Sequence, residues 1–357
     1  MTENARTADS TELAAWLRLA LVPALGPERQ RKLLAAFGLP SGIFAHSRSS
    51  IAAVIGGEGA DLLLAPCERT AVDAALAWSA EDGNHILTLA DSAYPQALLD
   101  TADPPLLNRP GLAIVGARSS TAQGVANAEA FARSLSEAQL TIISGLALGI
   151  DAAAHRGALS SGEGSTVAVI GTGADRIYPA GNAALAREIA ASGAIVSEFA
   201  LGTPPLRHNF PRRNRLIAGL SHGVLVVEAA IGSGSLITAR LATEIGREVF
   251  AIPGSIHSPL ARGCHRLIRE GAKLVETAED VLEELRGRVS TLPPARTRSR
   301  RKAASAPLTA PSQALRCGLT VDALYAILLP MELEAVLVRL PGNRFQRLHK
   351  EGAPVRD

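Results

Sequence analysis

Cysteines are few in this sequence and long apolar runs are missing, and both absences limit what the protein can be. Its three cysteines lie far apart in the chain, which argues against a disulfide framework and against a CxxC metal site. No stretch approaches the ~18 uncharged residues that a membrane-spanning helix needs. The polar, acidic start MTENARTADSTELAAW is unlike a secretory signal. We therefore expect a cytoplasmic protein without a membrane span.

Lysine is also scarce. Only four of the 36 basic residues are lysines, the others are arginines, and the net charge is +2. Alanine is abundant as well, so GC-rich coding accounts for part of the arginine excess. A length of 357 residues with 47% hydrophobic and 20% charged residues is typical of a soluble globular chain of two or three domains. The places where the arginines cluster are therefore more informative than their number.

Composition divides the chain into four regions. Residues 1–78 contain short helical patterns and predict a small helical domain, whose hairpin LVPALGPERQRKLLAAFGLP either binds DNA or a protein or only packs. Residues 79–286 alternate apolar strand-like runs with helical patterns. Residues 287–313 are basic and proline-rich and predict a linker. Residues 314–357 predict a short winged-helix-like module, cut short because little room remains for three helices.

The central region determines the fold class. Near-continuous apolar runs that alternate with helical patterns indicate a parallel sheet covered on both faces. We therefore expect an α/β domain with an extended, Rossmann-like, doubly wound and mostly parallel sheet. The expected strands are 112–116, 140–144, 166–171, 194–199, 223–229 and 248–254.

Small residues and glycines follow several of these strands. In an open parallel sheet, ligands bind beyond the carboxyl ends of the strands. Gly116 ends the first expected strand, Arg118 and Ser119 follow it, and Gly145 follows the second. Turns of this type offer backbone N–H groups to a phosphate, and Arg118 adds a forked cation. The strand ends therefore predict a site for a long, phosphate-bearing ligand.

The usual nucleotide motifs are missing from these turns. The first turn is GARSSTAQG instead of GxGxxG, with an arginine where the backbone would approach a pyrophosphate, and no P-loop lysine is present. These departures argue against NAD or ATP, and we expect no cofactor.

The densest basic segment is PLRHNFPRRNR, residues 205–215. A ring among guanidinium groups suits a single nucleic-acid strand, because the cations hold the phosphates and the ring stacks on a base. The alternative is that Phe210 is a core residue and that some arginines pair with Glu198 or Glu228, and we expect at least one arginine to do so. The arginines of the segment are Arg207, Arg212, Arg213 and Arg215.

Candidate catalytic groups are sparse. Asp151 and His155 have the i,i+4 spacing of metal ligands on a helix, but a third ligand is missing nearby, so we expect a cap and a packed polar contact. Glu198 and Glu228 each lie at or near a strand end and are candidates for an acid/base pair. We expect instead that both form structural hydrogen bonds with nearby backbone groups or arginines. The sequence therefore predicts neither a catalytic nor a metal site.

Long motifs at the six strand ends resemble those of the DNA-processing protein DprA (Smf) family over roughly residues 80–285. The resemblance implies a protein that is not an enzyme. It implies a homodimer that binds and protects single-stranded DNA entering the cell in natural transformation, and that loads the RecA recombinase onto it past single-strand-binding protein. The motifs are VGARSSTAQG, SGLALGIDAAAH, GTGADRIYPAGN, SEFALGTPPLRHNFPRRNRLIAGLS, VVEAAIGSGSLITA and VFAIPGSIHSP.

The resemblance also implies site residues. Arg118 matches the arginine of the family's glycine–small–arginine motif, and Arg207 and Phe210 match its basic residue and phenylalanine. Residues 1–78 resemble the family's sterile-alpha-motif-like domain, and PGNRFQRL resembles the end of its winged helix. Combined with the strand ends, the expected DNA-binding residues are Gly116, Arg118, Ser119, Gly145, Arg207, Phe210 and Arg213.

Two other functions compete with DNA binding. The core resembles, more distantly, the lysine-decarboxylase-like phosphoribohydrolases, which hydrolyse nucleotides, but their PGGxGTxxE motif is missing and Glu244 lies too far along to replace its glutamate. A scaffold that has lost DNA binding is favoured if the arginines are buried in ion pairs. Cys264 and His265 stand where the DprA pattern is broken. The family's contact there is either lost or replaced by His265, so neither residue is counted among the expected site residues. The apolar stretch 216–220 is expected to pack inside, near a dimer interface.

Overall fold

The computed structural model describes residues 3–66, 69–91, 93–95, 107, 109–162, 165–286, 289, 308–309, 337–340 and 344–347. The chain divides into two compact units, Met1–Pro293 and Pro294–Asp357. Within the described residues, no helix is long and apolar enough to cross a bilayer.

The N-terminal residues form a series of short helices around their own apolar core. Gly26 is the first residue of the second helix and Gly38 follows its last residue, and both adopt positive φ angles, which glycine tolerates at helix boundaries. The helices are α1 (Glu3–Leu21), α2 (Gly26–Phe37), α3 (Pro40–Ala45), α4 (Arg48–Ile55), α5 (Gly57–Leu64) and α6 (Arg69–Ser79). Their buried side chains include Leu19, Leu25, Leu33, Ile43, Ile51 and Leu63.

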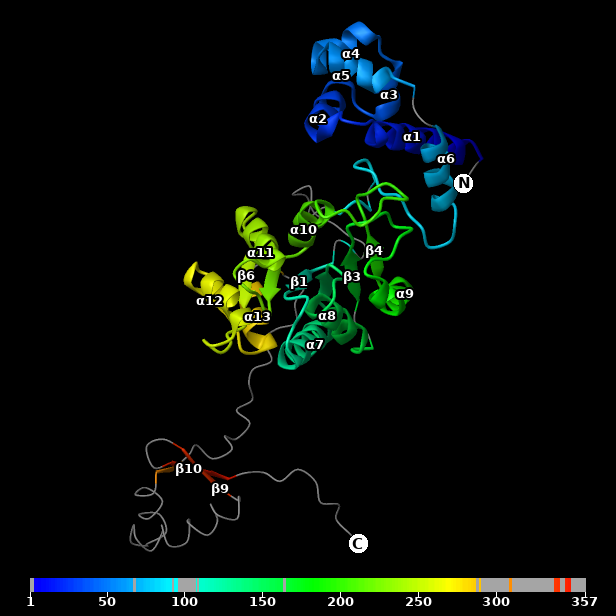
Figure 1. Ribbon diagram of the computed structural model, residues 1–357. Coiled ribbons are helices and arrows are strands. Elements are labelled where there is room, and N and C mark those ends of the chain that lie inside the picture. Colours follow the sequence, from blue (N-terminus) through cyan, green and yellow to red (C-terminus); the bar gives the residue numbers. More distant parts are fainter. Residues whose placement is uncertain are drawn as a thin grey trace, which may run out of the picture. The chain divides into compact units, whose positions relative to one another are not determined.

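A seven-stranded sheet with the order β4-β3-β2-β1-β5-β6-β7 forms the centre of the next region, and every neighbouring pair is parallel (Figure 1). The predicted α/β fold is confirmed, and the sheet is parallel throughout. The edge strand β7 escaped prediction because two residues are too short for a hydrophobic pattern. The strands are β1 (Gly111–Val115), β2 (Thr141–Ser144), β3 (Thr166–Val169), β4 (Ala194–Val196), β5 (Gly223–Val226), β6 (Glu248–Ala251) and β7 (Lys273–Leu274).

Helices cover both faces of this sheet. Leu112 and Ile114 of β1 pack in a cluster with α7, α8 and α13, whereas Ala113 and Val115 pack in a second cluster with α10, α11 and α12. Burial on both faces explains why the central strands are apolar throughout instead of alternating. The helices are α7 (Ala122–Glu137), α8 (Ile150–Leu159), α9 (Ala183–Ser192), α10 (Asn209–Gly219), α11 (Gly234–Glu244), α12 (Arg262–Arg269) and α13 (Ala278–Leu285), with short 3₁₀ turns at Ala180–Asn182 and Pro259–Ala261.

The winding of the sheet reverses beside β1. The chain steps outward from β1 through β2 and β3 to β4, and then returns to place β5 on the other side of β1. Loops that leave β1 and β5 diverge at such a switch point, and the crevice between them is where open α/β sheets bind ligands. The turn that contains Arg118 follows β1, so the topology places this arginine at the crevice.

Near the C-terminus, β8 (Leu308–Thr309), β9 (Leu337–Leu340) and β10 (Arg344–Arg347) form an antiparallel sheet in the order β8-β10-β9. β9 and β10 pair with each other, and β10 lies in the segment PGNRFQRL, which resembles the end of a winged helix. β8 lies within the predicted linker 287–313, and its two residues pair with β10. The rest of that linker, apart from residue 289, and the helical part of the module predicted over 314–357 lie outside the described residues.

Candidate nucleic-acid interface

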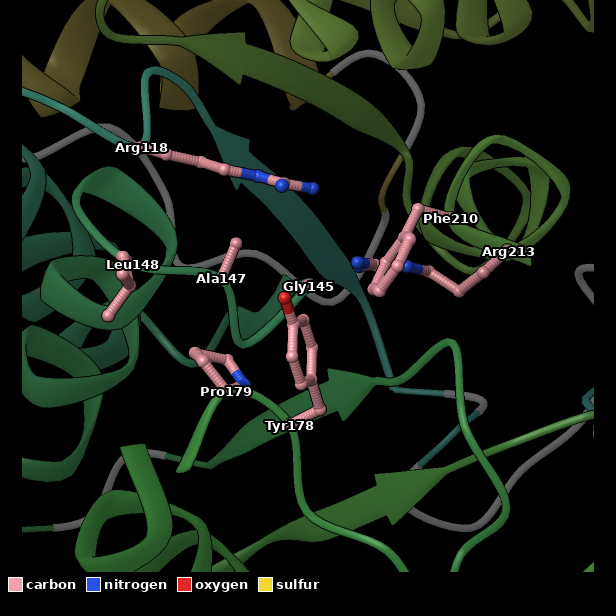
Figure 2. Close-up of a pocket in the computed structure, with 8 residues that line it drawn as sticks. All are labelled: Arg118, Gly145, Ala147, Leu148, Tyr178, Pro179, Phe210 and Arg213. Carbon is pink, nitrogen blue, oxygen red and sulfur yellow. The ribbon is translucent and has the colours of Figure 1, made fainter. Parts of the chain in front are cut away.

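A small hollow lies beyond the carboxyl ends of the central strands, beside the first turn of α10 (Figure 2). Its volume is about 50 Å³, well below the roughly 300–1,000 Å³ of pockets that enclose small molecules. It therefore suits one phosphate group or the edge of one base. The lining residues are Arg118, Gly145, Ala147, Leu148, Tyr178, Pro179, Phe210 and Arg213.

The hollow brings together four of the seven predicted site residues, and the other three lie outside its lining. Ser119 and Arg207 are exposed, and Arg207 makes no ion pair with any residue in the described part of the chain. A Cβ atom at Gly116 would lie 2.6 Å from the Ile150 side chain, so close packing against α8 explains why a glycine occupies this position.

Arg118 and two aromatic rings form one side of the hollow. The Arg118 Cζ atom lies 5.5 Å from the centroid of the Phe210 ring, and the Tyr178 ring centroid lies 5.7 Å from that of Phe210, tilted by 45°. Tyr178 is 43% exposed, and its hydroxyl points into the hollow (Figure 2). A cation beside accessible ring faces has the chemistry that a nucleotide requires.

Arg213 forms the floor of the hollow. Its side chain is 4% exposed, and its Nε and Nη1 atoms are buried without a hydrogen-bond partner among the described residues. Burial lowers the pKa of Arg213 to about 10, partly opposed by Asp151, so the guanidinium stays charged at neutral pH. A Cβ at Gly145 would collide with this guanidinium. Gly145 therefore makes room for Arg213, and DNA contact by either residue stays a prediction.

Carboxylates of the protein itself occupy the strand-end turns. Glu228 accepts hydrogen bonds from the backbone N and the Oγ1 of Thr121, at 3.0 and 2.5 Å. Asp151 accepts from the backbone N atoms of Gly145 and Ala147, at 3.1 and 3.4 Å. The protein's own carboxylates therefore occupy the N–H groups of Thr121, Gly145 and Ala147. Binding of a phosphate by the N–H groups of Arg118 and Ser119 stays a prediction. The positive charge of the hollow comes from its guanidinium groups.

The polar pairs that sequence analysis considered for catalysis are structural. His155 is buried, its Nδ1 lies 2.8 Å from Thr166 Oγ1, and burial lowers its pKa to about 3. The packed contact predicted for this residue is confirmed. Arg215 forms an ion pair with Glu198, as expected for at least one arginine of the segment. Within the described residues, no group of three or more His, Cys, Asp or Glu side chains could hold a metal ion.

The positions that depart from the family motifs also make structural contacts. His265 Nε2 lies 3.0 Å from the carbonyl oxygen of Gly254. Burial raises the pKa of Cys264 to about 11, so the thiol stays protonated. Leu216 and Ile217 are buried, which confirms their expected interior packing, whereas their relation to a dimer interface stays a prediction.

The other four residues that line the hollow were not predicted from the sequence: Ala147, Leu148, Tyr178 and Pro179. Tyr178 lies between β3 and α9, far from the arginine segment in sequence, and Leu148 lies between β2 and α8. The signal for Tyr178 was present, because an aromatic residue follows a strand end in GTGADRIYPAGN. Its pairing with Phe210 depends on how the loop after β3 and helix α10 are arranged in the folded protein.

The fold and the hollow define a Rossmann-like protein with a cationic, aromatic-walled site at the switch point of a parallel sheet. Residues 85–286 match the family model of DNA recombination-mediator protein A. The match spans more than half of the chain, and the chain belongs to this family. The family resemblance inferred from the strand-end motifs is thereby confirmed.

Relatives with known names are similar over the same region. Protein Smf of Escherichia coli (strain K12) is 44% identical over 238 residues, which cover 64% of this chain and 63% of that protein. The chain thus spans slightly less than two thirds of the length of this relative. DNA processing protein DprA of Streptococcus pneumoniae is 48% identical over 207 residues, which cover 55% of this chain and 73% of that protein.

Solved structures agree with the fold. The X-ray structure of DprA from Streptococcus pneumoniae matches with a TM-score of 0.64 at 38% identity, covering 76% of this chain and 97% of that one. DNA processing protein A from Helicobacter pylori, whose structure concerns its single-stranded DNA binding mode, matches with a TM-score of 0.50 at 30% identity, covering 55% and 94%.

Proposed function

We propose that this chain is a single-stranded DNA-binding recombination mediator, and that the hollow beside α10 holds the DNA. One observation carries the proposal: Arg118 lies beside the rings of Phe210 and Tyr178 at the switch point of the sheet. The Helicobacter pylori relative, described for its single-stranded DNA binding mode, supports it.

The chemistry of the hollow determines the kind of binding. Arg118 attracts a phosphate, and Phe210 and Tyr178 offer ring faces to a base. Stacking tolerates every base, so binding depends little on sequence. Phosphate contacts release counterions, so affinity falls steeply as salt rises. The proposal requires no cofactor.

The remaining predicted contacts extend the site. Arg207 and Ser119 are exposed, and we assign Arg207 to the phosphate that follows the one at the hollow. Arg213 supports the hollow from beneath, where its charge attracts the strand. Gly116 and Gly145 keep the backbone close to the site by leaving room for their packing partners.

Family membership supports the wider role. In this role the protein acts as a homodimer, protects DNA that enters the cell during natural transformation, and loads RecA onto it past single-strand-binding protein. Nucleotide hydrolysis, the alternative considered from sequence, gains no support from the site: Glu198 is paired with Arg215, and Glu228 accepts from Thr121.

The test is fluorescence anisotropy of a labelled oligothymidine at two salt concentrations. We expect tight, salt-sensitive binding that collapses in the double variant Arg118→Ala with Phe210→Ala. Arg133→Ala removes an equal charge from the distal half of α7, where Arg133 donates to Ser160, and should bind as the wild type does. Unchanged binding by the double variant would refute the proposed site. A large loss on one DNA sequence alone would refute the proposed mode of binding.

A further inference from the structure

A second arginine–aromatic pair lies on the flank of α10 that faces away from the hollow. The Arg212 Cζ atom lies 5.7 Å from the centroid of the Phe199 ring. Arg212 and Phe210 are two residues apart on α10, so their side chains point about 200° apart around the helix axis. We propose that Arg212 and Phe199 form a second nucleotide-binding position for the same DNA strand, an inference that rests on the proposed function.

Both members of this pair are available to a ligand. Arg212 is exposed and Phe199 is half-buried. Phe199 belongs to none of the hydrophobic clusters formed by the described residues. Arg18 lies 3.9 Å from the ring centroid of Phe44 in the N-terminal helices, a close stack. The separation at Phe199 is longer, at 5.7 Å, and Phe199 is only half-buried, as is Phe210 at the 5.5 Å separation of the hollow.

The local charge favours a phosphate. Glu198 precedes Phe199 in the chain, and a free carboxylate there would repel DNA, but Arg215 neutralises it in an ion pair. Arg212 makes no ion pair with any residue that the structure describes. Its positive charge therefore stays available to an anion, as does the charge of Arg207 in the connection between β4 and α10.

Hydrogen bonds hold the segment that contains Phe199. The Ser197 hydroxyl donates to the carbonyl oxygen of Thr172 at 2.6 Å and accepts from the backbone N of Phe199 at 3.0 Å. The backbone N of Gly202 donates to the Asp175 carboxylate at 2.8 Å. These bonds tie the connection before α10 to the loop after β3, so the ring is positioned before DNA arrives and little ordering is needed on binding.

The experiment measures anisotropy with labelled oligothymidines from about 4 to about 16 nucleotides long, a range that spans typical site sizes for single strands. We expect Phe199→Leu and Arg212→Gln to bind the shortest strand like the wild type, because it reaches only the hollow. On the longest strand we expect losses of roughly 5- to 150-fold for Phe199→Leu, the value of one base stack. Phe199→Tyr keeps the ring and should bind like the wild type.

The salt dependence of binding distinguishes the role of Arg212 from that of Phe199. Arg212→Gln should lower the slope of log affinity against log salt by about 0.7, the value for one phosphate contact on a single strand. Phe199→Leu should leave that slope unchanged, because it removes a stack and no charge. Arg133→Gln, which removes a charge far from α10, should change neither the slope nor the affinity.

Several results would overturn the second position. Wild-type affinity of Phe199→Leu and Arg212→Gln for the longest strand would do so, and so would equal losses at every length, which indicate damage to the hollow. Arg118→Gln tells this failure apart from failure of the proposed function. If it alone weakens binding, only the second position is wrong. If it also binds like the wild type, the hollow itself is wrong.

Discussion

Replacing Gly145 by alanine would place a methyl group where two buried charged side chains already lie. The new Cβ would collide with the Arg213 guanidinium and would lie 2.6 Å from Asp151 Oδ2. Gly145 does not have a positive φ angle, so the effect arises from crowding and not from backbone strain. Either Arg213 or Asp151 has to move.

The free-energy cost of Gly145→Ala follows from the contacts of the two side chains that it would displace. Arg213 is 4% exposed and cannot swing into water without crossing the hollow. Displacing Asp151 would break its hydrogen bonds to the backbone N atoms of Gly145 and Ala147, each worth about 1 kcal/mol. Overpacking in a dense interior costs about 1–3 kcal/mol. We therefore expect Gly145→Ala to lower the free energy of unfolding by about 2–3 kcal/mol.

Two assays measure the effect of Gly145→Ala. In a domain of this size, 2–3 kcal/mol corresponds to a fall in Tm of about 4–12 °C by differential scanning calorimetry. If Arg213 moves into the hollow, oligothymidine affinity should fall about tenfold or more, because the site is then partly filled. Gly232→Ala is the matched control: no atom lies within 4 Å of its Cβ position, and its φ is not positive.

A rescue experiment completes the test. Arg213→Met removes the colliding guanidinium, so adding Gly145→Ala to that variant should cost much less than it does alone. Wild-type Tm and affinity in Gly145→Ala would refute the reasoning. Equal losses from Gly145→Ala in the presence and absence of the guanidinium would show that the crowding lies elsewhere.

Two further predictions concern His155 and Tyr178. Burial lowers the pKa of His155 from 6.5 to about 3, so between these values the unfolded chain binds the extra proton and stability falls as pH falls. This one group contributes up to about 1.4 kcal/mol per pH unit to the slope of the free energy of unfolding against pH. Urea unfolding between pH 7 and pH 5 should therefore show a slope that is smaller by up to that amount in His155→Gln, and an unchanged slope would contradict the prediction. Tyr178→Phe should bind oligothymidine like the wild type and Tyr178→Ala at least about fivefold more weakly, because the ring and not the hydroxyl stacks; wild-type affinity in both variants would exclude Tyr178 from the site.

Much of the site could be predicted from local sequence. The turn after the first strand contains Arg118, and the basic segment contains Phe210, so the placement of these two residues followed from strand order and from their chemistry. Tyr178 could not be paired with Phe210 in advance, because Tyr178 lies in the loop after β3 and Phe210 in the first turn of α10, and the two meet only when the chain is folded.

The arginine segment contains neighbouring residues whose burial the sequence alone does not determine. Arg212 and Arg213 are neighbours of identical chemistry, yet Arg212 is exposed beside Phe199 and Arg213 is buried beneath the hollow. Which of them faces inward depends on the rotation of α10 against the sheet, and side-chain packing across the whole interface sets that rotation.

By itself, the sequence determined the parallel α/β fold and the edge of the sheet where the site lies, because apolar periodicity and glycine-rich strand ends are local properties. Only the tertiary structure decided which groups occupy the strand-end turns. Glu228 reaches Thr121 across 107 residues of sequence, and such a contact depends on the adjacency of β1 and β5. Several N–H groups in these turns are therefore bonded to carboxylates of the protein, and the positive charge of the hollow comes from its guanidinium groups.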